Sequence, residues 1–131
     1  APKKIYLIDT AFNQISGFNF SSNNGRNLEN VVFIELKRRK KEVYYFSEKN
    51  ECDFIIKDGA RVTQVIQVCY NLNKEDKERE INGLLQAINK FKLKEGMIIT
   101  FDQDEKLRVE GKMIQVISIW KWLLQRAELI E

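Results

Sequence analysis

The chain contains no histidine, and this absence removes several classes of catalytic site at once. A Ser-His-Asp triad, a Cys-His pair and any acid–base scheme that depends on imidazole are excluded. With two cysteines, Cys52 and Cys69, and no histidine, a zinc site built from four Cys or His ligands is excluded as well. Two cysteines are also too few for a disulfide framework, and they favour a reducing, cytoplasmic setting.

Nucleotide-binding signatures and membrane segments are missing too. Neither G-x-x-x-x-G-K-[S/T] nor G-x-G-x-x-G occurs, so we do not expect the chain alone to hydrolyse nucleotides. No apolar run approaches the roughly 20 residues that span a bilayer, and the first residues do not resemble a signal peptide. The 131 residues are 44% hydrophobic and 31% charged, with a net charge of +3. These values indicate one mildly basic globular domain and do not by themselves predict nucleic-acid binding.

The spacing of apolar residues predicts an α/β fold with a mixed sheet. The expected elements are a helix over 26–40, strands over 43–47, 52–56 and 62–70, a helix over 74–92, strands over 97–101, 107–109 and 113–117, and a final helical turn. Short turns join the first three strands, so we expect an antiparallel meander there. Before the first helix, an apolar segment at 5–8 leads into a loop rich in Asn, Ser and Phe.

Two polar residues interrupt otherwise apolar strands. Asp53 follows Cys52 in a run of strand formers, and Gln67 lies on the next run, two residues before Cys69. A buried carboxylate is costly unless it is paired, hydrogen-bonded or bound to a metal, so Asp53 is expected to have a partner. Two interpretations stay open: a metal site, or a structural polar cluster at the end of a strand.

The ordered set of motifs resembles the PD-(D/E)XK nuclease superfamily. It is more closely similar to the nuclease-like C-terminal domain of AAA-type ATPases of archaea and bacteria. The resemblance is carried by KIYLIDT at 4–10, GRNLENVVF at 25–33, ECDF at 51–54, IQVCY at 66–70, REI at 79–81 and IWKWLL at 119–124. It implies a restriction-endonuclease-like core of a helix, a three-strand meander, a second helix and a further strand.

The resemblance also implies roles for particular residues. Glu29 would be the acid on the first helix, Asp53 the metal-bound aspartate, and Gln67 would occupy the (D/E) position. These three side chains would hold Mg²⁺, for which Mn²⁺ can substitute, and we expect them to converge. An amide oxygen supplies less charge to the ion than a carboxylate would.

The position of the motif lysine departs from the active pattern, because Cys69 stands there. A thiol cannot replace an ammonium that stabilises developing phosphate charge. Lys74 or Arg79, early in the following helix, could supply the cation from another position, and we take Arg79 as the candidate catalytic residue. Whether the chain is a Mg-dependent endonuclease is therefore open.

The resemblance gives the domain organisation and the expected function. Residues 1–24 would be an N-terminal segment or linker after an ATPase region, and residues 25–131 the nuclease-like domain. We expect a DNA-binding domain with weakened or lost phosphodiester hydrolysis. The alternative is a non-catalytic protein-interaction or regulatory domain. A basic surface around the site would favour the first, and an exposed apolar patch at Trp120 or Trp122 the second. The basic run 37–41 fits either a solvated helix end or a DNA contact.

The cysteines give a test of the expected strand register. If Asp53 and Gln67 share a face of the sheet, Cys52 faces the other way and Cys69 faces with Gln67. The two thiols would then lie on opposite faces, too badly oriented for a disulfide.

Overall fold

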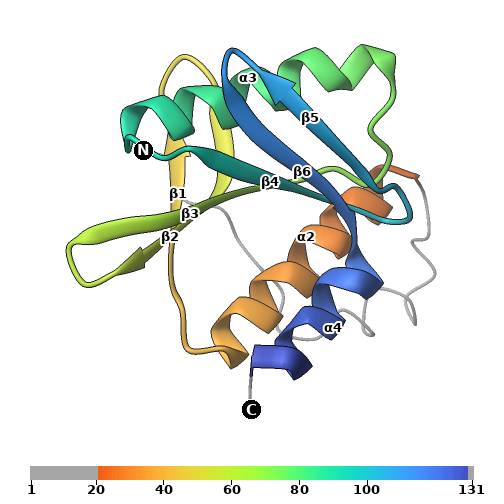
Figure 1. Ribbon diagram of the computed structural model, residues 1–131. Coiled ribbons are helices and arrows are strands. Elements are labelled where there is room, and N and C mark those ends of the chain that lie inside the picture. Colours follow the sequence, from red (N-terminus) through yellow and green to blue (C-terminus); the bar gives the residue numbers. More distant parts are fainter. Residues whose placement is uncertain (1–20, 130–131) are drawn as a thin grey trace.

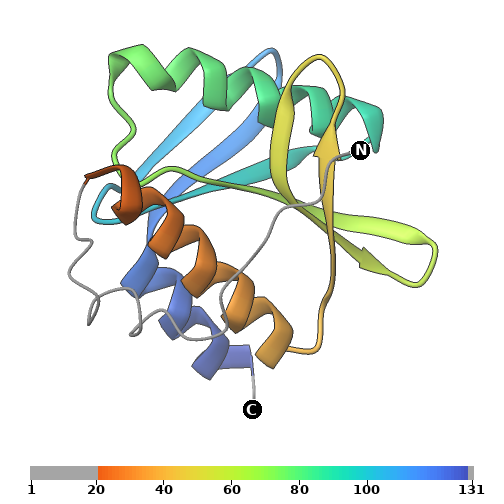
Figure 2. The same cartoon turned by 180° about the vertical axis from the view of Figure 1, so that it is seen from behind.

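A six-stranded mixed sheet separates one helix from two others in the computed structural model, which describes residues 21–129 and the side chains of residues 24–125 (Figure 1). The helices are α2 (Ser21–Arg38), α3 (Lys74–Lys90) and α4 (Ile119–Leu129). The strands are β1 (Glu42–Ser47), β2 (Glu51–Asp58), β3 (Arg61–Val68), β4 (Glu95–Thr100), β5 (Glu105–Val109) and β6 (Lys112–Ser118). Helix α3 covers one face of the sheet, and α2 and α4 lie together on the other (Figure 2).

The strands follow the spatial order β1-β2-β3-β4-β6-β5. Strands β1, β2 and β3 form the antiparallel meander, and β3 and β4 run parallel on either side of the α3 crossover. Strand β6 pairs parallel with β4 and antiparallel with β5. The expected α/β fold with a mixed sheet is therefore confirmed, with β1 and β5 at the two edges.

Helix α3 begins at the predicted residue and ends two residues before the predicted position. The side chain of Asn73 caps its start by accepting a hydrogen bond from the backbone N–H of Asp76 at 3.0 Å. Its end is closed by bonds from Phe91 to Ala87 and from Leu93 to Ile88. The residue between Phe91 and Leu93 is Lys92, which has a left-handed backbone conformation, and the chain reverses direction there.

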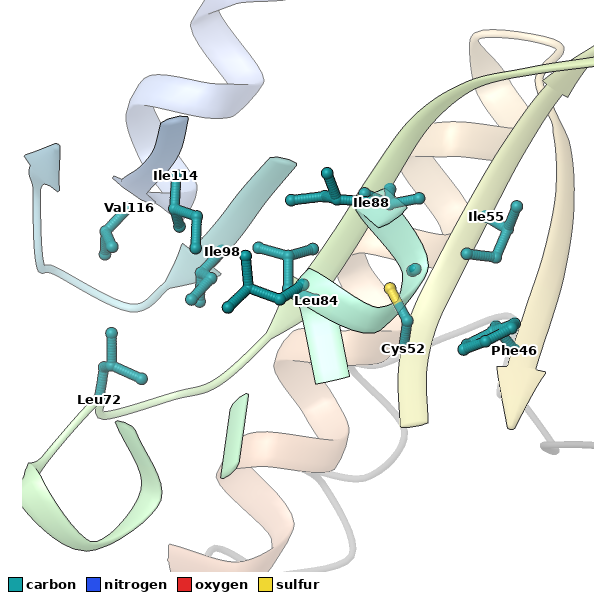
Figure 3. Packing of buried hydrophobic residues seen from close by; sticks show 12 residues of the cluster. Phe46, Cys52, Ile55, Leu72, Leu84, Ile88, Ile98, Ile114 and Val116 are labelled. Carbon is teal, nitrogen blue, oxygen red and sulfur yellow. The ribbon is translucent and has the colours of Figure 1, made fainter. Parts of the chain in front are cut away.

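Two apolar clusters hold the layers together. On the α3 face, Leu84 and Ile88 of α3 pack over Ile55, Ile98 and Ile114 of the sheet (Figure 3). On the other face, the cluster joins α2 and α4 to the sheet through the apolar residues Leu28, Val32, Leu36, Phe54, Ile56, Ile66, Val68, Ile99, Ile117 and Trp122. Both faces of β2 and β3 are thus covered, which explains why their central residues are almost continuously apolar.

The helices that open and close the described chain are longer than expected. Helix α2 starts at Ser21, although residues 21–25 were predicted to be loop and cap. Ser and Asn have only modestly unfavourable helix propensity, and no proline stands among them to stop the helix. Helix α4 has 11 residues rather than one turn. The predicted segment at 5–8, and residues 1–20 of the predicted linker, lie outside the described residues.

Helix α4 buries one of its two tryptophans and exposes the other. Trp122 is 3% exposed and Trp120 is 55% exposed. The guanidinium of Arg39 lies 4.2 Å from the Trp122 ring centroid, donates to the Trp122 carbonyl and pairs with Glu35. This arginine of the basic run is thus a link between α2 and α4. None of the helices in the described part of the chain is long and apolar enough to cross a membrane.

Candidate functional site

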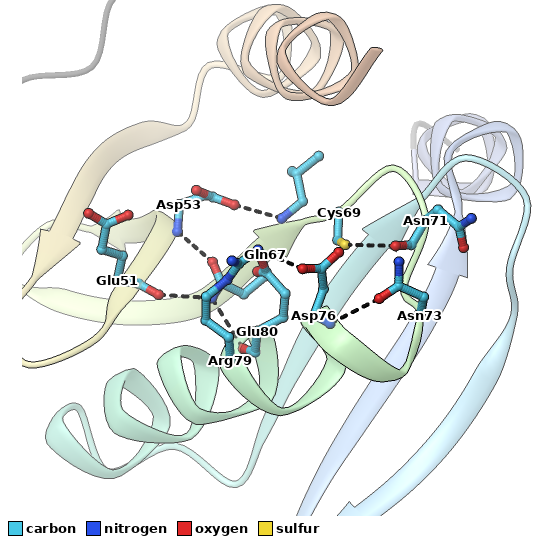
Figure 4. Close-up of polar contacts among 10 residues, drawn as sticks. Glu51, Asp53, Gln67, Cys69, Asn71, Asn73, Asp76, Arg79 and Glu80 are labelled. Carbon is cyan, nitrogen blue, oxygen red and sulfur yellow. Dashed lines mark hydrogen bonds and ion pairs between the residues drawn. The ribbon is translucent and has the colours of Figure 1, made fainter. Parts of the chain in front are cut away.

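Strands β2 and β3 separate at the position of Asp53 and Gln67. Their last backbone pair on this side is Phe54 with Ile66. Beyond it, the N–H of Asp53 donates to the side-chain oxygen of Gln67 at 2.8 Å, and the N–H of Val68 donates to the Asp53 carboxylate at 2.8 Å (Figure 4). Side chains here satisfy backbone groups that a continuous ladder would pair. The structure therefore brings together Asp53 and Gln67, as the sequence predicted.

Both the nitrogen and the oxygen of the Gln67 side-chain amide form hydrogen bonds. Its nitrogen donates to the carbonyl of Glu51 at 2.8 Å and to the carbonyl of Glu80 at 3.2 Å, while its oxygen accepts from Asp53. A primary amide has two N–H donors and one oxygen, so both donors and the oxygen are engaged. Gln67 thus joins β2, β3 and α3 at one point.

Helix α3 approaches this point closely because residue 83 is a glycine. A Cβ at Gly83 would collide with the carbonyl oxygen of Glu51 and lie 2.7 Å from the Gln67 nitrogen. Gly83 is buried inside the helix, where glycine is otherwise unfavourable. The close contact between α3 and the ends of β2 and β3 explains this glycine.

Asp53 and Gln67 line a cavity of about 330 Å³. The other lining residues come from the β1–β2 turn, the start of β2 and α3: Lys49, Asn50, Glu51, Arg79 and Glu80. Arg79, the candidate cation, is exposed, with its guanidinium 3.1 Å from the Asp76 carboxylate and 3.6 Å from that of Glu80. Lys49 and Glu80 were not predicted from the sequence as site residues. The position of Glu80, directly after Arg79 and three residues before Gly83, is the only signal that could have indicated it.

Glu80 is the most perturbed carboxyl group of this cavity. Burial and, after it, the neighbouring charge of Asp53 raise its pKa from 4.5 to about 7, against the opposing effect of Arg79. Three acids, Glu51, Asp53 and Glu80, therefore line the same small space, and near neutral pH Glu80 is partly protonated. A perturbed acid in a cavity is a typical feature of a functional site.

Cys69 is a neutral thiol in this environment. Burial, followed by the charges of Glu80 and Asp76, raises the pKa of Cys69 to about 11. Its sulfur lies 3.4 Å from the carbonyl of Asn71. Cys69 therefore supplies neither the positive charge of a lysine nor a reactive thiolate at neutral pH.

Both cysteines are free thiols, as predicted, but the predicted opposite faces are wrong. Cys52 belongs to the apolar cluster under α3, and Cys69 packs against that same cluster. The cause is a register shift in the β1–β2 pair, where Phe46 pairs with Cys52 but Tyr44 pairs with Ile55. The extra residue in β2 reverses the alternation of side chains at this end of the strand.

Glu29, the predicted helix acid, lies half-buried on α2. The described residues that line the cavity of Asp53 and Gln67 do not include it. The convergence of Glu29 with the other two side chains therefore stays a prediction.

The donors around Asp53 do not fit a resident Mg²⁺ ion in this arrangement. Among the side chains described for residues 24–125, no three from Cys, Asp or Glu are grouped so that they could hold a metal ion. The Gln67 oxygen already accepts a backbone hydrogen bond, and Glu80 holds a proton over part of the neutral range. The catalytic and metal-binding roles of Glu29, Asp53, Gln67 and Arg79 stay predictions.

Comparison with known proteins places the chain in a family. The model of a domain of unknown function, DUF4143, matches residues 24–122. Uncharacterized protein MJ1544 of Methanocaldococcus jannaschii is 41% identical over 132 residues, covering 92% of this chain and 29% of that protein. An uncharacterized protein of Haemophilus influenzae is 29% identical over 123 residues, covering 93% of this chain and 29% of that protein. The chain thus spans less than a third of these relatives, and because the family model matches most of its length, it belongs to the DUF4143 family.

Proposed function

We propose that this chain is the nuclease-like domain of a larger ATPase, related to the PD-(D/E)XK nucleases, and that it binds DNA with weakened or lost phosphodiester hydrolysis. One observation carries the proposal. Asp53 and Gln67, the residues at the first two motif positions, meet in one cavity where β2 and β3 separate. The length of the relatives outside the matched part leaves room for an ATPase region.

The charges in the cavity support weakened hydrolysis. Metal-assisted phosphodiester hydrolysis needs anionic ligands that hold the ion and a cation that neutralises developing charge. Gln67 supplies a neutral amide whose donors and oxygen are engaged, and Cys69 is an uncharged thiol. Lys49 and Arg79 are the cations that line the cavity, and Arg79 is shared with Asp76. These two residues can attract a phosphate, but no carboxylate stands at the Gln67 position to complete a metal site.

A second candidate function, a protein-interaction domain, is favoured by the outer face of α4. Trp120, Leu123 and Leu124 are 55%, 37% and 58% exposed. Three large apolar side chains exposed within one and a half turns form a surface that a partner protein could cover.

The deciding experiment measures DNA binding and cleavage separately. The purified chain is mixed with labelled single-stranded, duplex and branched DNA, with Mg²⁺ and with Mn²⁺. We expect binding without appreciable cleavage, and binding that persists in Asp53→Ala. Efficient cleavage that is lost in Asp53→Ala would show an active nuclease and refute the weakened site. Cleavage that survives Asp53→Ala would place the chemistry elsewhere. No binding to any DNA would favour the protein-interaction function.

A further inference from the structure

A concave surface of the described chain lies away from Asp53, between β1, β2, β3 and the end of α3. It has a volume of about 560 Å³, and we call it the hairpin groove. The β2–β3 hairpin projects from the body of the sheet beneath the end of α3 (Figure 1). We propose that the hairpin groove binds single-stranded DNA, with phosphates on Lys57, Arg61 and Lys92 and a base stacked on Tyr44. This proposal rests on the proposed function, for which it names the DNA-binding surface.

The charge of the groove is of one sign. Lys57, Arg61 and Lys92 line it, and no Asp or Glu does so among the described residues. Among the described side chains, those of residues 24–125, none of these three cations takes part in an ion pair. Three cations that line one hollow raise the local concentration of a polyanion and can neutralise its phosphates.

The floor and the rim of the groove are aromatic and apolar. Phe46 and Phe91 meet edge to face, with ring centroids 5.8 Å apart, on the floor of the groove. On the rim, Tyr44 is 50% exposed, and the ammonium of Lys57 lies 5.2 Å from its ring centroid. The Tyr44 hydroxyl also donates to Glu42 at 3.3 Å, which holds the ring in place. An oriented, exposed ring beside a cation is the arrangement on which an unpaired base stacks.

Lys92 occupies a backbone position where glycine would be favoured. It follows α3 with φ +57°, in the left-handed region, which costs an ordinary residue about 1 kcal/mol. The lysine places an exposed cation on the rim of the groove, opposite the β2–β3 hairpin. A glycine there would relax the backbone but would remove this charge.

The combination of cations and stacking surface favours a single strand over a duplex. A duplex presents its phosphates but hides the faces of its bases, so it could use the cations and not Tyr44. Strand β2 also connects the groove to the cavity of the candidate site. Asp53 and Lys57 are four residues apart on it, or about 13 Å at the usual rise of a strand. A single-stranded DNA bound in the groove can therefore reach the neighbourhood of Asp53.

The test compares two charge-matched triple variants by fluorescence anisotropy with a labelled single-stranded oligonucleotide. The groove variant is Lys57→Gln, Arg61→Gln and Lys92→Gln. The control is Lys37→Gln, Lys40→Gln and Lys41→Gln, which removes three exposed charges at and just after the end of α2. We expect the groove variant to lose at least tenfold in affinity and to lower the slope of log K against log salt by about 2, at roughly 0.7 per phosphate contact. We expect the control to change the slope by less than about 0.7.

Tyr44 provides a second, charge-independent test. We expect Tyr44→Ala to lower affinity for the single strand by about tenfold, and Tyr44→Phe, which keeps the ring, to lower it far less. We expect duplex DNA to bind more weakly than the single strand and to be insensitive to Tyr44→Ala. The inference is overturned if the α2-end control lowers affinity as much as the groove variant, or if Tyr44→Ala has no effect. In those cases the proposed function stands, whereas a wild-type chain that binds no DNA refutes DNA binding altogether.

Discussion

The backbone N–H of Asp53 donates to the side-chain oxygen of Gln67 at 2.8 Å, just beyond the last backbone pair of β2 and β3. The same amide donates to carbonyl groups of β2 and α3. A carboxylate at position 67 could accept from Asp53 but has no N–H to give to those carbonyls. Gln67 therefore stabilises the junction of three elements in a way that an acid at this position could not.

Replacing Gln67 with leucine should destabilise the protein strongly. Three backbone groups, the buried N–H of Asp53 and the part-buried carbonyls of Glu51 and Glu80, would lose a partner. We expect the free energy of unfolding to fall by about 3 kcal/mol, since an unsatisfied buried group costs about 1–3 kcal/mol. Urea denaturation measures this change. Gln64→Leu, at an exposed position of the same strand, is the control and should change stability by about 0.5 kcal/mol or less. Equal losses in both variants would contradict the structural role of Gln67.

Replacing each of two helical glycines with alanine should change the stability of the protein in opposite directions. In Gly83→Ala the new methyl group would push α3 away from Glu51 and Gln67. We therefore expect the free energy of unfolding to fall by about 2 kcal/mol or more. In Gly25→Ala the methyl group would meet nothing within 4 Å, and we expect a gain of up to about 1 kcal/mol from helix propensity. Thermal unfolding of both variants decides the matter, and a Gly83→Ala protein as stable as wild type would refute the close contact.

The meeting of Asp53 and Gln67 could be predicted because it depends on local signals. Alternating apolar residues and short turns place β2 next to β3, so polar residues near the same end of both strands come together. The two faces of the cysteines could not be predicted. The register shift near Cys52 depends on how β1 and β2 pair, and no glycine or proline stands there to indicate it.

The presence of Glu80 in the cavity could not be predicted either. It depends on the rotation of α3 about its own axis relative to the sheet. Leu84, Leu85 and Ile88 show which side of the helix is buried, and Gly83 adjusts how close that side comes. The position of a residue at the border of the buried stripe follows from this tertiary contact and not from the periodicity of the helix. The hairpin groove also follows from a tertiary contact, since it forms only when the end of α3 lies over the meander of β1, β2 and β3.

The raised pKa of Glu80 predicts a specific pH dependence of stability. Its folded-state pKa of about 7 exceeds its ordinary value of 4.5, so the folded state binds the proton more tightly. The contribution of Glu80 to stability is therefore most favourable below pH 4.5 and is lost as the pH rises towards 7. We expect Glu80→Gln to remove this loss and to be more stable than wild type at pH 8, on the order of 2 kcal/mol.

Urea denaturation from pH 4 to pH 8 tests this dependence through the difference between wild type and variant, which cancels the other carboxyl groups. Glu78→Gln, at an exposed position of the same helix, removes a charge without the burial and is the control. If the Glu80→Gln difference varies with pH no more than that of the control, the raised pKa of Glu80 is wrong.

Restoring the motif residues should restore a response to metal ions. In Gln67→Glu combined with Cys69→Lys, a second carboxylate joins Asp53 and adds charge to the cavity, while the lysine replaces a neutral thiol. The loss of the Gln67 hydrogen bonds should lower the melting temperature without metal, and Mg²⁺ or Mn²⁺ should raise it again because binding to the folded state stabilises it. We expect wild type to show little or no such shift. Adding Asp53→Ala to the double variant should abolish the shift, which identifies the ion as bound at this cavity.

Cleavage of single-stranded or branched DNA above background by the double variant would show that the rest of the site is intact. A double variant that folds yet shows neither a metal-dependent shift nor cleavage would instead favour a non-catalytic interaction domain.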